Sequence, residues 1–252
     1  MRRLSALWLP ATTLCALSAV LLWAMQGGLM GDGWKDVFSP AIWLLLLQSH
    51  FGSVWIWQII FAVVALAVAL INPRHLSPLL LIFAVGQVLF LGQTGHAALQ
   101  DGIAGLCSQL SHSLHLLAAG WWAGGLIPLL VCMKLANRER WRKPATVAMM
   151  RFSRYGHLAV ILIIVTGISN MLLITGFHWP QNSDYRRLLL LKTALVMVMV
   201  ALALINRYIL VPRFARQDSQ ATRLFITLTQ AEILLSAIVL ALVSLFATWD
   251  PF

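Results

Sequence analysis

Long apolar runs separated by short polar stretches dominate the chain. A helix needs about 20 residues to cross a bilayer. Runs of roughly that length predict seven crossings, at residues 4–25, 54–71, 76–92, 110–133, 156–176, 188–210 and 224–247. The apolar piece Ala41–Leu47 is too short to cross, so we expect it at the membrane interface or between helices. The pattern predicts an all-α protein, a polytopic transmembrane helix bundle with about seven crossings.

The first apolar run follows a basic start, Met1-Arg2-Arg3, which is typical of signal peptides as well as of retained helices. We favour a retained helix, because the run is long enough to span and no small-x-small cleavage site stands out. Since no soluble module is evident either, we expect one integral membrane domain over residues 1–252.

Composition supports a membrane protein. Apolar residues make up 60% of the chain and charged residues only 10%, whereas about 25% of an ordinary soluble domain is charged. The mean hydropathy of +0.84 points the same way, so the expected partner is the lipid bilayer. The net charge of +10 does not predict a nucleic-acid partner, because the cations lie in short loops between apolar runs.

The Lys and Arg residues divide unevenly between the two sides of the predicted bundle. With a cytoplasmic N-terminus, fourteen of the 18 fall on the inner side. Only Lys35, Arg186, Arg187 and Lys192 then fall outside. Because Lys and Arg accumulate in cytoplasmic loops, we expect the N-terminus inside and the C-terminus outside.

Residues 92–125, which connect two of the predicted crossings on the outer side, carry a dense set of potential metal ligands. His112 and His115 are three residues apart on a predicted helix, so their imidazoles project from one face about one turn apart. His96 precedes them at the end of the previous crossing, and an antiparallel hairpin can bring it within reach. Neutral imidazole binds copper, zinc, iron and nickel.

Thiolate and thioether groups shift this preference towards cuprous copper, and Cys107 and Met30 supply such groups near the outer side. The sequence therefore predicts a metal site at His96, His112 and His115, with copper favoured. An alternative stays open at this point, in which these are interface histidines hydrogen-bonded to loop carbonyls. Asp101 and Cys107 are weaker candidates, in the loop that precedes His112.

Glu232 lies inside the last apolar run, where a charged side chain costs about 2.5–3.5 kcal/mol on insertion scales. Such a residue is expected to be protonated, to pair with a basic group or to form part of an ion path. Lys192 is one candidate partner, although it can also extend to the outer headgroups. For Asn170 and Asn206 we expect hydrogen bonds between helices.

Nothing in the sequence indicates an enzyme. A glycine-rich phosphate loop with its lysine is missing, as is a serine nucleophile motif. We therefore expect neither a hydrolase nor a nucleotide-driven pump.

Several short motifs follow one another along the chain: GHAA at 95–98, HLLAAGWWAGGL at 115–126, RFSRYG at 151–156, TG at 166–167, YRRLLLLKTAL at 185–195, NRYILVPR at 206–213 and the segment around Glu232. In this order they resemble the CopD family of bacterial copper-resistance inner-membrane proteins. QSHFGSVWIWQ at 48–58 also resembles a family stretch, with Gln58 where arginine is common. The similarity runs from about residue 40 to the C-terminus.

The resemblance implies a multi-pass protein of the bacterial inner membrane that acts in copper homeostasis or resistance. It also implies transport or delivery of copper across the cytoplasmic membrane, together with a periplasmic carrier of the CopC type. By position, His96 and His115 match histidines of the family pattern, and Glu232 and Lys192 match polar residues of its later helices. His112 is added from spacing alone.

Two other functions remain open from the sequence. In one, histidines from different helices bind haem in a membrane b-type cytochrome, although the candidates here gather at one surface. In the other, the protein is a non-transporting partner of a periplasmic copper carrier.

Overall fold

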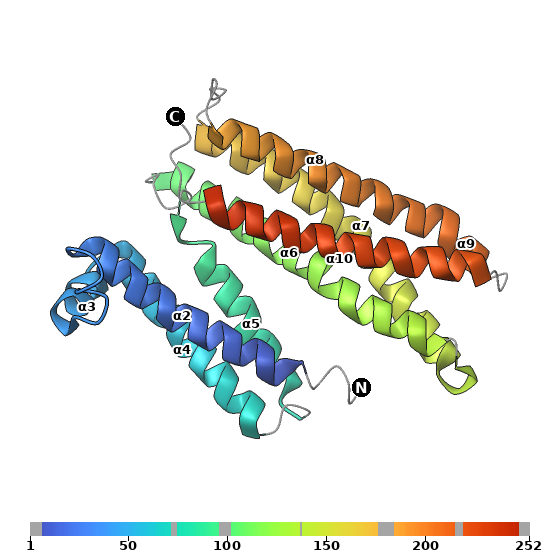
Figure 1. Ribbon diagram of the computed structural model, residues 1–252, viewed down its shortest axis with the longest axis horizontal. Coiled ribbons are helices and arrows are strands. Elements are labelled where there is room, and N and C mark those ends of the chain that lie inside the picture. Colours follow the sequence, from blue (N-terminus) through green and yellow to red (C-terminus); the bar gives the residue numbers. More distant parts are fainter. Residues whose placement is uncertain are drawn as a thin grey trace. The chain divides into compact units, whose positions relative to one another are not determined.

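The computed structural model describes residues 7–71, 75–95, 102–136, 138–175, 184–214 and 219–246, and this part of the chain is helical throughout its regular elements (Figure 1). The prediction of an all-α, polytopic helix bundle is confirmed. The elements are α2 (Trp8–Met30), α3 (Pro40–Leu47), α4 (His50–Ile71), α5 (Ser77–Leu91), α6 (Gly102–Ala136), α7 (Glu139–Thr175), α8 (Asp184–Ile205), η2 (Asn206–Leu210), α9 (Val211–Phe214) and α10 (Ser219–Phe246).

Six of the described helices are long and apolar enough to cross a membrane: α2, α4, α6, α7, α8 with its extension to Arg213, and α10. The remaining predicted crossing, α5, is an apolar helix of 15 residues. At a rise of 1.5 Å per residue it is about 22 Å long, shorter than the roughly 30 Å hydrocarbon layer. The short apolar piece forms the eight-residue helix α3, too short to cross.

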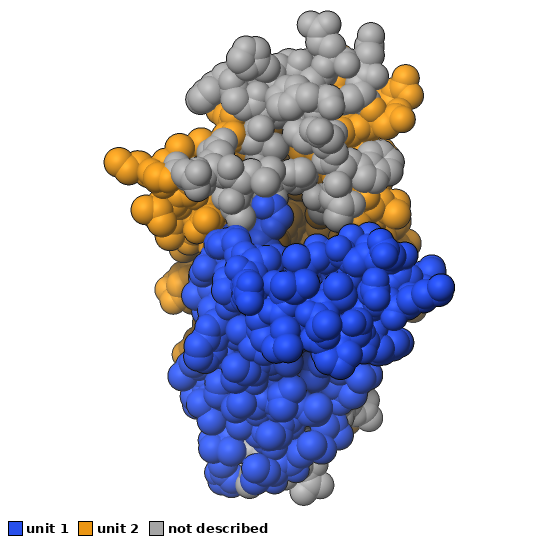
Figure 2. All heavy atoms as spheres, turned by 90° about the vertical axis from the view of Figure 1, so that its left-hand side faces the viewer, with its two compact units in different colours: residues 1–98 blue, residues 99–252 orange. Residues whose placement is uncertain are grey.

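The chain divides into two compact units, residues 1–98 and residues 99–252, which Figure 2 distinguishes by colour. In the first unit, α4 packs against both α2 and α5. Small residues allow α2 and α4 to approach closely at Ala16, Ala19 and Ala62. The indole of Trp55 donates a hydrogen bond of 2.9 Å to the carbonyl of Ala19, which ties α4 to α2.

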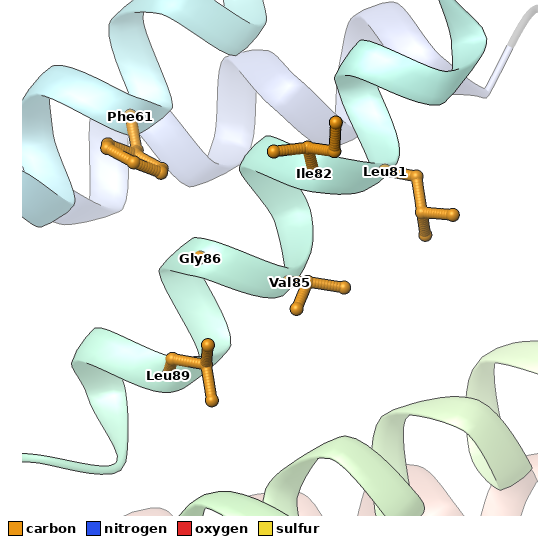
Figure 3. A pocket seen from close by; sticks show the side chains of 6 residues that line it. All are labelled: Phe61, Leu81, Ile82, Val85, Gly86 and Leu89. Carbon is orange, nitrogen blue, oxygen red and sulfur yellow. The ribbon is translucent and has the colours of Figure 1, made fainter.

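An apolar hollow lies beside α5 in the first unit (Figure 3). Its lining consists of hydrocarbon side chains and one glycine, namely Phe61, Leu81, Ile82, Val85, Gly86 and Leu89. Since this lining offers a metal no ligand, the hollow is not a candidate metal site.

In the second unit, α6 and α7 form a long hairpin, and α10 packs against both α6 and α8 (Figure 1). Neighbouring helices run antiparallel. At one end, Tyr185 of α8 packs edge-on against Phe246 of α10. Further along, Asn206 of η2 contacts Glu232 of α10. The apolar core includes Ala118, Trp122 and Leu126 of α6 with side chains of α7 and α8.

The basic segment after α6 is largely helical. The predicted crossing begins at residue 156, but α7 begins at Glu139 and continues to Thr175. An acidic residue in the first turn stabilises the start of a helix. The apolar run 156–176 therefore marks only the second half of a 37-residue helix.

Three glycines on one stretch of α6 differ in what surrounds them. A methyl group on Gly125 would overlap the ring of Phe152 on α7, whereas Gly120 and Gly124 have nothing within 4 Å of such a group. Gly125 is thus the residue of this set that lets α6 and α7 pack closely.

We predict that Gly125→Ala destabilises the protein by about 1–3 kcal/mol, the usual range for overpacking. Gly124→Ala is the matched control on the same helix and should leave stability nearly unchanged. Thermal unfolding in detergent measures both, and equal unfolding temperatures for the two variants would contradict this account of the α6–α7 contact.

Candidate metal centre

His115 is the best-defined candidate ligand. Its ring is half-buried on α6, and Nδ1 lies 2.9 Å from Oγ1 of Thr166 on α7. The Thr166 hydroxyl donates its one hydrogen to the carbonyl of Leu162, so Oγ1 accepts from His115 and the ring proton lies on Nδ1. The ring also forms a hydrogen bond with the backbone of Ile163 on α7. In the neutral imidazole with its proton on Nδ1, Nε2 carries the lone pair that a metal would use. Metal-binding histidines are commonly fixed through their second nitrogen in this way.

Gly167 makes room for the ring. A Cβ atom at this position would lie 3.4 Å from Cε1 of His115, so anything much larger than a methyl group would press on the imidazole. The Thr-Gly pair at 166–167 therefore has two separate roles: the threonine orients the ring and the glycine leaves space for it.

His112 lies one turn before His115 on α6, half-buried and close enough to act on its ring electrostatically. The structure thus brings together the two histidines that the i, i+3 spacing predicts. Two buried oxygens of this region, Oγ of Ser111 and Oδ1 of Asn170, have no hydrogen-bond partner. Because His115 faces Thr166 and α6 and α7 are antiparallel, Asn170 lies one turn along α7, at the level of residues 111–112.

Lys192 also belongs to this region, because its ammonium group acts electrostatically on His115. It lies on the third turn of α8 and is half-buried. A positive charge here repels a cation bound at Nε2 of His115. The ammonium group in this position therefore lowers the affinity of His115 for a cation.

The remaining predicted ligands are His96, Asp101 and Cys107. His96 and Asp101 lie outside the described residues, so the predicted convergence of His96 with His115 stays a prediction. Cys107 is an exposed residue of α6 rather than part of a loop, eight residues or about 12 Å from His115 along the helix. Among the described residues, no three His, Cys, Asp or Glu side chains gather closely enough to hold a metal.

Glu232 is buried, with 2% of its surface exposed. Its Oε1 accepts a hydrogen bond of 2.7 Å from Nδ2 of Asn206, which confirms the expected helix-to-helix bond for Asn206. The suggested pairing with Lys192 is wrong, because Lys192 lies fourteen residues before Asn206, about 21 Å along α8. In the antiparallel pair, Lys192 is near the C-terminal end of α10.

Two further histidines are already engaged. His157 places Nδ1 3.0 Å from the carbonyl of Ser153 and Nε2 3.0 Å from the hydroxyl of Tyr208. In the first unit, Nε2 of His50 lies 3.3 Å from the carbonyl of Gln93. With both its nitrogens in contact with protein oxygens, His157 packs α7 against η2 and is not a free ligand.

The fold and the candidate site thus define a multi-pass helical membrane protein with an oriented imidazole inside a helix hairpin. Comparison of the sequence with protein families identifies the family within this class. Residues 146–246 match the family copper resistance protein D, and residues 1–106 match the copper resistance protein D-like N-terminal domain. The chain belongs to the copper resistance protein D family.

Curated relatives agree with this assignment. The chain is 47% identical to the inner membrane protein YebZ of Escherichia coli K12 over 236 residues, covering 94% of this chain and 81% of that protein. It is 28% identical to copper resistance protein D of Pseudomonas syringae pv. tomato, covering 98% and 83%. It is 32% identical to the copper transport protein CutJ of Bacillus subtilis, covering 70% and 34%. No solved structure matches.

These matches, together with the six apolar helices, make this a multi-pass protein of the cytoplasmic membrane. They also correct one boundary. The family similarity was expected from about residue 40, but the N-terminal family domain matches from residue 1. That match ends at residue 106, eight residues past the boundary between the two compact units.

We predict that Thr166→Val weakens metal binding about 10- to 100-fold, the usual cost of losing a partner that orients a ligand. Valine keeps the shape of threonine but cannot accept from Nδ1 of His115. Thr166→Ser retains the hydroxyl and should restore affinity. Titration of the purified variants with copper measures their affinities. Equal affinities for the valine and serine variants would show that the Thr166 hydroxyl does not support the metal site.

Proposed function

We propose that this protein binds copper at His115 and His112 and passes it across the cytoplasmic membrane in copper homeostasis or resistance. The observation that carries the proposal is the His115 ring, held through Nδ1 by Thr166 with Nε2 left for a ligand. Relatives named for copper resistance and copper transport support copper as the cargo.

The chemistry of the side chains fits copper. Imidazole nitrogen binds copper in both of its common oxidation states. Its affinity for Cu²⁺ is higher than for the other divalent first-row metals. His96 is the third ligand that we propose, and it belongs to the GHAA motif at 95–98. The unpartnered oxygens of Ser111 and Asn170 add polar groups that a hydrated ion can contact.

The charge distribution supports an outward-facing site. Lys134 lies in the last turn of α6, Arg213 lies on α9 and Arg223 lies near the start of α10, all at the end of the second unit that is farther from His115. Basic residues mark the cytoplasmic side of helical membrane proteins. Copper would thus enter at His115 from the periplasm, where a CopC-type carrier is the partner that we propose.

A haem protein is less well supported. A b-type haem needs histidines from different helices. Of the described histidines outside α6 in the second unit, His157 already contacts oxygens through both ring nitrogens. An optical spectrum of the purified protein without a Soret band is the expected result.

We predict that His115→Ala lowers copper affinity by more than the 10- to 100-fold loss expected for Thr166→Val, because a ligand is lost outright. His112→Ala should act in the same direction. Equilibrium copper binding in detergent and copper uptake into reconstituted vesicles measure the two parts of the proposal.

His157→Ala is the control, since it removes a histidine of the same unit that is already hydrogen-bonded. It should leave copper affinity unchanged. If the His115 and His157 variants bind copper equally well, the proposed site is wrong. If wild-type protein binds copper but vesicles take up none, the protein is a non-transporting partner of a copper carrier.

A further inference from the structure

A second polar site lies in the same unit, about 21 Å along α8 from the level of Lys192. It centres on Glu232, and the buried face of α10 on which Glu232 lies also carries Thr229 and Ser236, three residues before and four after. Thr229 has no exposed surface, Glu232 is 2% exposed and Ser236 is 8% exposed. Asn206 of η2, 6% exposed, faces this group from the neighbouring helix.

Two atoms of this site have no hydrogen-bond partner: Oδ1 of Asn206 and Oγ1 of Thr229. Buried polar atoms are nearly always paired, so an unpaired one needs an explanation. Ser236, by contrast, is satisfied by the carbonyl of Glu232 at 2.8 Å. The site therefore holds a carboxylate beside two oxygens that are free to accept a hydrogen bond.

The hydrogen-bond partner of Glu232 is an uncharged amide, and the kind of partner decides which form of the carboxyl group is favoured. A lysine or arginine would hold the carboxyl group in its ionised form. An amide can serve both forms: Nδ2 donates to the carboxylate, and after a rotation of the amide Oδ1 accepts from the protonated acid. Asn206 begins a π-helical segment, a local irregularity that occurs frequently at functional sites.

Within the described part of the chain, Glu232 forms no ion pair, and its carboxyl group accepts a hydrogen bond from the side chain of Asn206. Arg207 donates to Oγ of Ser153 and Tyr208 contacts His157. The nearest charged residue along α10 is Arg223, nine residues or about 13 Å earlier.

The other described titratable residues of α6, α8 and α9 lie six or more residues along their helices from the level of Glu232. They are Cys107, His112, His115, Cys132, Lys134, Asp184, Tyr185, Arg186, Arg187, Lys192 and Arg213. Next to Glu232, Ile233 and Leu235 of α10 pack against the apolar cluster that includes Leu126 of α6 and Met199 of α8. Among the described residues, an ionised Glu232 thus has an amide partner and no counter-ion.

We propose that Glu232, with Asn206 and Thr229, is a reversible proton-binding site within the membrane-spanning bundle. A proton from water adds to a carboxylate oxygen of Glu232, and the Asn206 amide turns so that Oδ1 accepts the new O–H. Release returns the proton to water and the amide to its first orientation. If the protein moves copper as proposed above, this site supplies the means to couple that movement to protons.

Infrared difference spectroscopy over a pH series tests the proton site without copper. Wild-type protein should show the carbonyl stretch of a buried protonated carboxyl group, and its amplitude should fall about tenfold per pH unit above the midpoint. Glu232→Gln should lack this band, and Glu139→Gln, at the start of α7, should retain it. The band's absence, its persistence at every pH, or its presence in Glu232→Gln would overturn the proposal.

A second measurement separates this proposal from the proposed transport. In reconstituted vesicles, an imposed pH gradient should change copper uptake by wild-type protein at least twofold and leave uptake by Glu232→Gln unaffected. Equal responses of the two proteins would overturn the coupling. If no copper enters at all while the infrared band titrates, the transport proposal fails and the proton site stands.

Discussion

The absence of water from the bilayer core is the constraint on which this structure depends. Backbone groups satisfy it by forming helices, and some polar side chains in those helices form hydrogen bonds with a neighbouring helix. Thr166 with His115 joins α7 to α6, and Asn206 with Glu232 joins η2 to α10. Each contact both satisfies polar atoms and fixes the orientation of a side chain capable of chemistry.

These contacts place two different kinds of chemistry at two levels of one unit. The level of His115 offers nitrogen, which suits copper, and carries a nearby positive charge from Lys192. The level of Glu232 offers oxygen acceptors beside an amide donor, and no described residue forms an ion pair there. Imidazole and carboxylate sites that are separated in this way can bind unlike ions, here a metal and a proton, without competing for the same ligands.

The helices were predictable because hydropathy reports directly which segments favour the bilayer. It did not predict the full lengths of α6 and α7, since their polar ends lie outside the apolar runs but continue the same helices. Local spacing likewise predicted that His112 and His115 share a face. Their surroundings were not predictable, because Thr166 lies 51 residues away in the sequence and its pairing depends on the register of the α6–α7 hairpin. The same holds for Glu232, whose true partner follows from the antiparallel register of α8 and α10 rather than from charge complementarity.

The central claim is that the Nε2 atom of His115 binds copper. X-ray absorption spectroscopy of the copper-loaded, detergent-purified protein tests it most directly, because imidazole ligands give a recognisable outer-shell scattering pattern. The account predicts imidazole scattering from the bound copper that diminishes in His115→Ala and is retained in His157→Ala. Copper bound without imidazole, or a spectrum unchanged by His115→Ala, would contradict it.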